Sequence, residues 1–168
     1  RHIDLDRYGL RAQPLRRSLL LYLGAFALIV PLFSAGYWLF LHHVCPSLPP
    51  WLVQCGPNAA PRLRLPPDLA LTILGQLLVV ALPEEFFFRG YLQGRLQEAL
   101  SPAAALLLAS ALFALGHVLV SFDPGTLAVF FPGLLFGLLR ASTGSVLAGT
   151  LLHASCNLLI DVLHRSWG

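Results

Sequence analysis

Three short segments of the chain combine side chains that can do chemistry with spacings that place them on single helix faces. The first segment holds Glu84, Glu85 and Arg89. Glu85 and Arg89 are four residues apart, so in a helix they share a face and can form an ion pair. Glu84 is turned by about 100° from Glu85 and can point toward a different neighbour. One carboxylate can therefore be held in an ion pair while the other remains available as a general base.

The other two segments repeat the four-residue spacing. Phe113 and His117 share one helix face, and His153 and Asn157 share another. A carboxylate can take a proton from water, while imidazole and carboxamide N–H groups can donate to a developing oxyanion. If the three segments meet, these residue types predict hydrolytic chemistry at their common centre.

The composition places these polar groups in a membrane. Of the 168 residues, 57% are hydrophobic and 11% are charged, and the mean hydropathy is +0.73. Soluble domains carry about 25% charged residues. This disfavours a soluble enzyme, a disordered chain and a disulfide-stapled secreted mini-protein. The basic residues are all arginine and do not gather into one basic face, so we expect no nucleic-acid partner.

Five apolar runs without a charged residue predict an all-α fold, a polytopic bundle of about five transmembrane helices with the site in its interior. The runs cover residues 18–41, 69–83, 99–122, 124–139 and 141–160. The second run reaches spanning length only if its helix continues through Glu84 and Arg89 to about Gln97. The fourth run is short and contains Pro132, which predicts a kinked or tilted helix.

Ionisable groups at membrane depth are functional candidates because they are costly there. An aspartate or arginine at a helix centre costs about 2.5 to 3.5 kcal/mol on insertion scales. Glu84, Glu85 and Arg89 are therefore expected to face the protein interior or a water-filled cavity. The simpler interpretation puts both glutamates where the span ends, with Arg89 reaching to the interface. His117 taken alone is equally explained as a hydrogen-bonded packing residue.

The three segments resemble the motifs of the CPBP intramembrane proteases, which include the CAAX prenyl endopeptidases of the Rce1 type and their bacterial Abi relatives. Residues 84–89 match E-E-x-x-x-R, residues 113–117 match F-x-x-x-H, and residues 153–157 match H-x-x-x-N. The chain looks like a small bacterial member that acts in protein sorting or processing. The resemblance implies an intramembrane endopeptidase whose substrate is a membrane-anchored or C-terminally processed protein.

The resemblance also implies a role for each motif residue. Glu84 and His117 would activate a water molecule, and His153 and Asn157 would stabilise the oxyanion. Glu85, Arg89 and Phe113 would support them.

A zinc-dependent version would use Glu84, His117 and His153 as ligands around an open position. We favour no cofactor, because the chain has no H-E-x-x-H pattern and the three groups lie on separate helices. The competing functions are a non-catalytic membrane scaffold or immunity protein, and a transporter or channel subunit with an ionisable path.

The chain divides into an N-terminal part, residues 1–67, and a catalytic bundle, residues 68–168. The first part comprises a basic segment, the first span and a proline-rich loop. The arginine distribution predicts a cytoplasmic N-terminus and an outside C-terminus. The resemblance to small bacterial members implies a bacterial cytoplasmic membrane. Cys45 and Cys55, in the loop placed outside, form either a disulfide or two unpaired thiols. Cys156 is expected to be a small packing residue.

Overall fold

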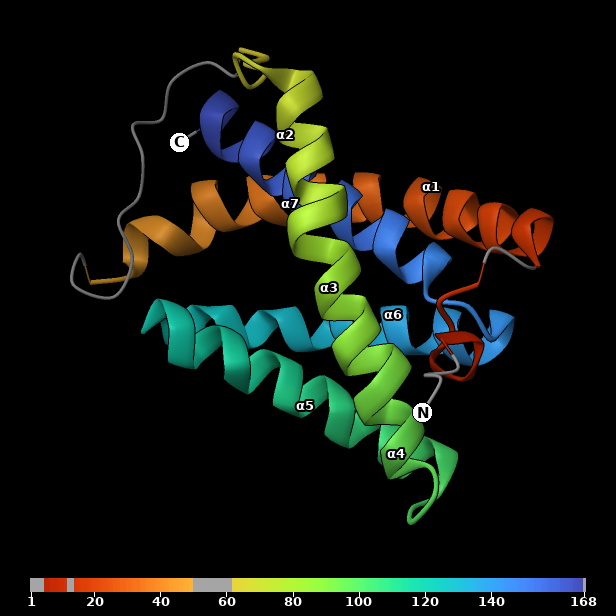
Figure 1. The fold of residues 1–168 in the computed structure, drawn as a ribbon. Coiled ribbons are helices and arrows are strands. Elements are labelled where there is room, and N and C mark those ends of the chain that lie inside the picture. The colour runs from red at the N-terminus through yellow and green to blue at the C-terminus, as the bar shows by residue number, and fades with distance from the viewer. Residues whose placement is uncertain (1–4, 12–13, 50–61, 168) are drawn as a thin grey trace.

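The computed structural model describes residues 5–11, 14–49 and 62–167. Every regular element in these ranges is a helix, which confirms the all-α prediction (Figure 1). The described residues contain five helices long and apolar enough to cross a membrane. They are Leu15–Ser47, Leu69–Leu96, Pro102–Ser121, Gly125–Thr143 and Leu147–Trp167.

Several of these spans change helix type along their length. The first consists of α1 (Leu15–Leu39), a π-helical turn η2 (Phe40–Val44) and a 3₁₀ turn η3 (Cys45–Ser47). The second consists of α2 (Leu69–Gly75), η4 (Gln76–Ala81), α3 (Leu82–Glu85), η5 (Phe86–Leu92) and α4 (Gln93–Leu96). The remaining elements are η1 (Leu5–Tyr8), α5 (Pro102–Ser121), η6 (Pro124–Val129), α6 (Phe130–Thr143) and α7 (Leu147–Trp167).

The second span runs to Leu96, as its predicted extension through the charged residues requires. Its segments η4 and η5 are π-helical and flank α3, which carries both glutamates. Pro83 in α3 has no backbone N–H, so it cannot continue the α-helical hydrogen-bond pattern into the preceding turn. Single π turns are a common way for a helix to absorb such an interruption, and they are frequent at functional sites.

Side-chain caps and left-handed residues set the helix limits in the second half of the chain. The Ser101 hydroxyl accepts a hydrogen bond from the Ala104 amide, 3.3 Å away, at the start of α5. The Asp123 carboxylate accepts one from the Gly125 amide, 2.8 Å away, at the start of η6. The helix α6 ends at Thr143 and is capped by Gly144, whose φ of 69° suits glycine.

The boundary between the last two spans does not coincide with the break between the last two apolar runs. Those runs break at Arg140, yet α6 continues through Arg140 to Thr143 and α7 begins only at Leu147. The charge does not end the helix because Arg140 lies in its last turn, near the helix C-terminus, where a cation is favourable. Pro132 is the third residue of α6, in the first turn, where a missing N–H costs no helical hydrogen bond.

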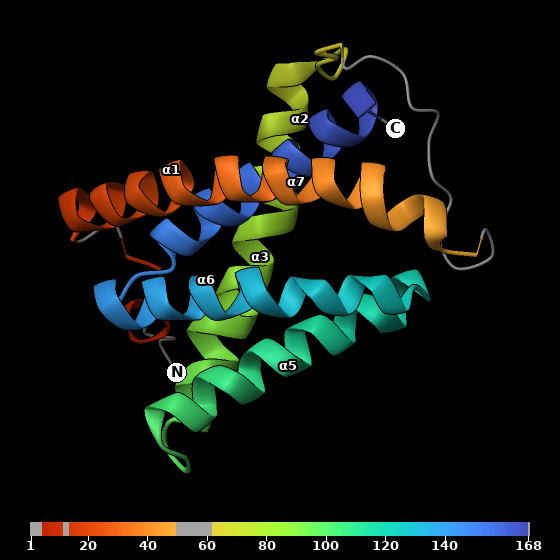
Figure 2. The same ribbon diagram turned by 180° about the vertical axis from the view of Figure 1, so that it is seen from behind.

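The spans form one bundle in which the second crosses the others steeply, as Figures 1 and 2 both show. The helix α1 packs along α7, and the hydroxyls of Tyr22 and Ser155 lie 3.1 Å apart between them. The helices α5 and α6 form an antiparallel pair on the other side. Phe136 and Leu152 are central to a buried cluster that joins α6 to α7.

Polar contacts join segments that are distant in the sequence at each of the two opposite ends of the bundle. At one end, Arg7 forms an ion pair with Glu98, and the Val146 amide donates to the Gly9 carbonyl. At the other end, the amides of Arg62 and Arg64 donate to Ser166. The five spans therefore alternate in direction, as five successive crossings require.

Cys45 and Cys156 differ in their bonding state. Cys45 is buried and disulfide-bonded. Cys55, the other member of the predicted pair, lies outside the described residues, so the pairing stays a prediction. Cys156 is a free, partly buried thiol that packs against the α6–α7 cluster, consistent with a packing role.

Candidate active site

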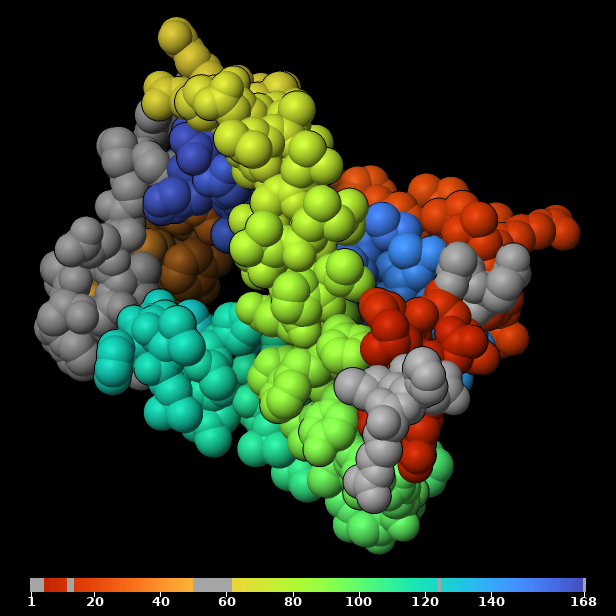
Figure 3. All heavy atoms as spheres, viewed as in Figure 1, coloured from red at the N-terminus to blue at the C-terminus, as the bar shows by residue number. Residues whose placement is uncertain are grey.

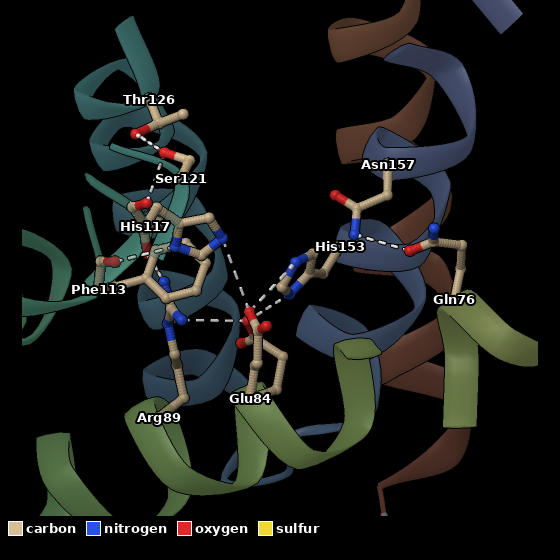
Figure 4. Close-up of polar contacts among 11 residues, drawn as sticks. Gln76, Glu84, Arg89, Phe113, His117, Ser121, Thr126, His153 and Asn157 are labelled. Atoms are coloured by element: carbon tan, nitrogen blue, oxygen red, sulfur yellow. Dashed lines mark hydrogen bonds and ion pairs between the residues drawn. The ribbon is translucent and has the colours of Figure 1, made fainter. Parts of the chain in front are cut away.

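Side chains from three spans converge on the carboxylate of Glu84 (Figure 4). Its Oε2 atom lies 3.9 Å from Nε2 of His117 on α5 and 3.8 Å from Nε2 of His153 on α7. The structure thus brings together one side chain from each of the three segments that the sequence analysis singled out. Glu84 Oε2 is itself buried and has no hydrogen-bond partner among the described residues, so its capacity to accept a hydrogen bond is unfilled.

The neighbouring Glu85 is instead fully buried in an ion pair. Its Oε1 lies 3.1 Å from Nη1 of Arg89, and both side chains are at most 1% exposed. The same oxygen lies 3.0 Å from Nδ1 of His153. The Arg89 guanidinium also donates to the Gly133 carbonyl, 3.0 Å away on α6. One glutamate is therefore held in an ion pair and the other is not, as the sequence analysis expected. Because Glu85 is buried within the span, it does not lie at the end of the span.

Hydrogen bonds hold both imidazoles so that Nε2 faces Glu84. An ionised carboxylate and a backbone carbonyl only accept, so the partner nitrogen must carry the proton. His153 Nδ1 donates to Glu85, and His117 Nδ1 donates to the Phe113 carbonyl, 3.0 Å away. In each neutral ring, Nε2 then carries a lone pair, so the two rings and Glu84 present three acceptors to one small volume.

Aromatic rings form a frame around the polar groups. The Phe113 ring lies 4.1 Å from the guanidinium carbon of Arg89 and meets His117 edge-on at 4.5 Å. Phe136 stacks on His153 with a ring separation of 5.0 Å. A guanidinium over an aromatic face is attracted to it, and more strongly when desolvated. Phe113 thus contributes both its ring and its carbonyl, and Phe136 joins it as a residue that no sequence motif indicated.

Two glycines allow the neighbouring helices to approach the buried ion pair. A Cβ atom added to Gly149 on α7 would lie 2.9 Å from Oε2 of Glu85. One added to Gly133 on α6 would lie 3.0 Å from Nη2 of Arg89 and 3.2 Å from the Phe113 ring. Small residues at such contacts are typical of packed membrane helices. These glycines are therefore part of what positions the site.

Asn157 lies one turn along α7 from His153 and is held by a residue that the sequence analysis missed. Its Nδ2 donates to Oε1 of Gln76 at 2.9 Å, across from the second span (Figure 4). One N–H of the Asn157 amide is thereby fixed, and its other N–H has no partner among the described residues. Gln76 is the first residue of η4. A lone amide in an apolar run is costly unless partnered, and this signal was available in the sequence.

The site is open on the side of Glu84 and His117. Their side chains are each 33% exposed, whereas that of His153 is 4% exposed. Figure 3 shows the molecular face hollowed between the yellow-green part of the second span and the teal end of α5. A separate apolar groove of about 460 Å³, lined by α1, the second span and α7, includes Tyr22 and Leu77 but none of the three converging side chains.

The three residues that would bind zinc in a zinc-dependent protease lie near each other, but their donor atoms are farther apart than those of zinc ligands. Zinc bonds of about 2.1 Å place tetrahedral donor atoms about 3.4 Å apart. The two printed donor separations at Glu84 are 3.8 and 3.9 Å. Among the described residues, no three His, Cys, Asp or Glu side chains are arranged to hold a metal ion.

Comparison with known proteins identifies the family. The model of the type II CAAX prenyl endopeptidase Rce1-like family matches residues 66–159, more than half of the chain, and this range includes every residue of the site. Neither the curated proteins nor the solved structures contain a match. The chain is an integral membrane protein that belongs to the type II CAAX prenyl endopeptidase Rce1-like family, a family of proteases.

Proposed function

We propose that the chain is an intramembrane endopeptidase that hydrolyses a peptide bond of a membrane-associated protein. The observation that carries this proposal is the approach of Glu84 Oε2 to the Nε2 atoms of His117 and His153. Both separations exceed 3.5 Å, so neither is a direct hydrogen bond, and a water molecule beside Glu84 can complete the contact. A water there would touch a carboxylate that has no other hydrogen-bond partner among the described residues.

In the proposed reaction, Glu84 removes a proton from this water as the water oxygen attacks the scissile carbonyl carbon. His117 orients the water through its Nε2 lone pair. The carbonyl oxygen becomes an oxyanion, which accepts hydrogen bonds from the unpartnered amide N–H of Asn157 and from Nε2 of His153, which for this step carries a second proton taken up from solvent before the attack. The proton held by Glu84 passes to the leaving amine, and the C–N bond breaks. Loss of one oxyanion donor typically costs about 10²–10³ in rate.

The other motif residues act through these groups. Glu85 fixes the ring of His153 and offsets its positive charge when it is protonated, at a separation of 3.0 Å. Arg89 balances the charge of Glu85 and anchors the second span to Gly133 on α6. Phe113 supplies the carbonyl that orients His117. We infer that these three are positioning residues rather than catalytic ones.

The substrate that fits this setting is a membrane-anchored protein, or one processed near a hydrophobic C-terminus. The exposed edge at Glu84 and His117 supports access by a chain segment at membrane depth. We also propose a bacterial cytoplasmic membrane with the N-terminus inside. The placement of Arg7, Arg95 and Arg140 at one end of the bundle supports this orientation.

The zinc-dependent version of the same protease is the second candidate, and one feature favours it. Both imidazoles donate their Nδ1 protons to oxygen acceptors, which is how zinc-bound histidines are commonly held. Glu84, His117 and His153 would then be ligands, and a bound zinc would lower the pKa of the attacking water.

The test is cleavage of membrane-anchored candidate peptides by the purified protein in liposomes. Glu84→Gln should abolish turnover while substrate binding, measured by cross-linking, persists. Asp68→Asn removes an exposed carboxylate at the start of the same span and should leave the cleavage rate unchanged. Full activity in Glu84→Gln would overturn the proposed role of this residue. Binding of partner proteins without cleavage of any candidate would favour the scaffold function.

A further inference from the structure

A polar pocket lies away from the active site, at the end of the bundle where the N-terminal segment packs. Its volume is about 200 Å³, and its walls come from η1, the end of the second span and the last turns of α6. The charged side chains that line it are Arg7, Arg95, Glu98 and Arg140. Two tyrosines, Tyr8 and Tyr91, complete the aromatic part of its wall.

The cations of this pocket outnumber the anions. A single carboxylate, Glu98, pairs with both Arg7 at 2.9 Å and Arg95 at 2.6 Å. Arg140 has no carboxylate partner among the described residues: its Nη2 donates to the Arg7 carbonyl at 3.4 Å, and its Nε is buried without any partner. A partly buried guanidinium without an anion is unfavourable, because its lost hydration is not replaced.

The position of the pocket indicates which anion would complete it. Arg95 lies in the last turn of the second span, Glu98 follows that span, and Arg140 lies in the last turn of α6. Both helix ends therefore lie at the level of lipid headgroups, where tyrosines are also enriched. Basic pockets between transmembrane helices at this level bind the headgroups of anionic lipids.

We propose that this pocket binds the phosphate group of an anionic phospholipid, with Arg140 and Arg95 as its main contacts. Bound lipid would also steady the second span. Tyr8 packs on Tyr91 and, edge-on, on Phe86, and the Tyr8 carbonyl lies against Gly90, where an added Cβ would overlap it. Phe86 directly follows Glu85 in the chain. The span that contacts the pocket therefore also carries the glutamates of the active site.

The experiment titrates the full chain, purified in uncharged detergent, with phosphatidylglycerol, phosphatidylcholine or inorganic phosphate. Retained lipid is counted by native mass spectrometry, and the thermal unfolding midpoint is followed in parallel. Phosphatidylglycerol should be retained in preference to phosphatidylcholine and should raise the midpoint. Arg95→Gln and Arg140→Gln should each weaken its binding about fivefold, the value expected for one arginine near an anionic surface.

Arg64→Gln, at the opposite end of the bundle, is the matched control and should bind phosphatidylglycerol as the wild type does. Arg95 is 51% exposed, so its variant remains informative if Arg140→Gln fails to fold. Equal retention of the two lipids by the wild type, or unchanged binding in both pocket variants, would overturn the proposal. Stabilisation by inorganic phosphate with no further effect of phosphatidylglycerol would overturn the lipid assignment and show a free-phosphate site.

Discussion

Replacing the two adjacent glutamates by glutamine, one at a time, should separate activity from stability. Glu85 is 0% exposed and holds both Arg89 and His153, whereas Glu84 is 33% exposed and holds neither by a hydrogen bond. Glu85→Gln leaves the buried charge of Arg89 without its counter-charge. Breaking one partner of a buried ion pair costs about 3–5 kcal/mol. For a chain of this size that lowers the unfolding midpoint by on the order of 10 °C.

Glu84→Gln should leave the free energy of unfolding nearly unchanged, within about 0.5 kcal/mol, because Oε2 of Glu84 makes no hydrogen bond to lose. It should nevertheless lower the cleavage rate by about 10²–10⁴-fold, the contribution of a general base. The assay combines thermal unfolding in detergent with cleavage of a membrane-anchored peptide. Equal destabilisation by both variants would refute the division of roles, as would a cleavage rate that survives in Glu84→Gln.

Other substitutions test the surroundings of the site. Gly149→Ala should destabilise the protein by about 1–3 kcal/mol, because the added Cβ meets Glu85. Gly75→Ala should not destabilise it, because a Cβ added there would meet no atom within 4 Å. Thermal unfolding of both variants checks this, and equal midpoints would contradict the close approach. Gln76→Leu removes the acceptor that fixes Asn157, so kcat should fall on the order of tenfold to a hundredfold with KM little changed. Gln76→Glu, which keeps an acceptor, should restore most of kcat; equal loss in both variants would indicate a merely structural effect.

Much of the fold could be predicted from the length of uncharged apolar runs, because lipid restricts the spanning backbone to helices. The second span was predicted to reach about Gln97 and ends at Leu96. The boundary near Arg140 was harder, because a charge in the last turn of a helix is tolerated and does not mark its end. The π-helical turns around Pro83 were not predicted, because a proline indicates that the hydrogen-bond pattern is interrupted but not how the helix absorbs the interruption.

Within the site, residues four apart on one helix could be predicted as pairs, and Glu85 with Arg89 is one of them. The contact of Glu85 with His153 could not be predicted, because it joins residues 68 positions apart. Gln76 and Phe136 were missed for the same reason: each acts on α7 from another span. Spacing reports which side chains share a helix face, whereas the packing of helices decides which faces meet.

The most direct test of the proposed mechanism is the cleavage rate of chelator-treated protein whose metal content has been measured. If Glu84 activates water with His117, metal-free wild-type protein should cleave a membrane-anchored peptide at its full rate, and metal-free Glu84→Gln should not cleave it. Loss of activity on chelation, restored by stoichiometric zinc, would contradict the metal-free mechanism and assign Glu84, His117 and His153 as metal ligands.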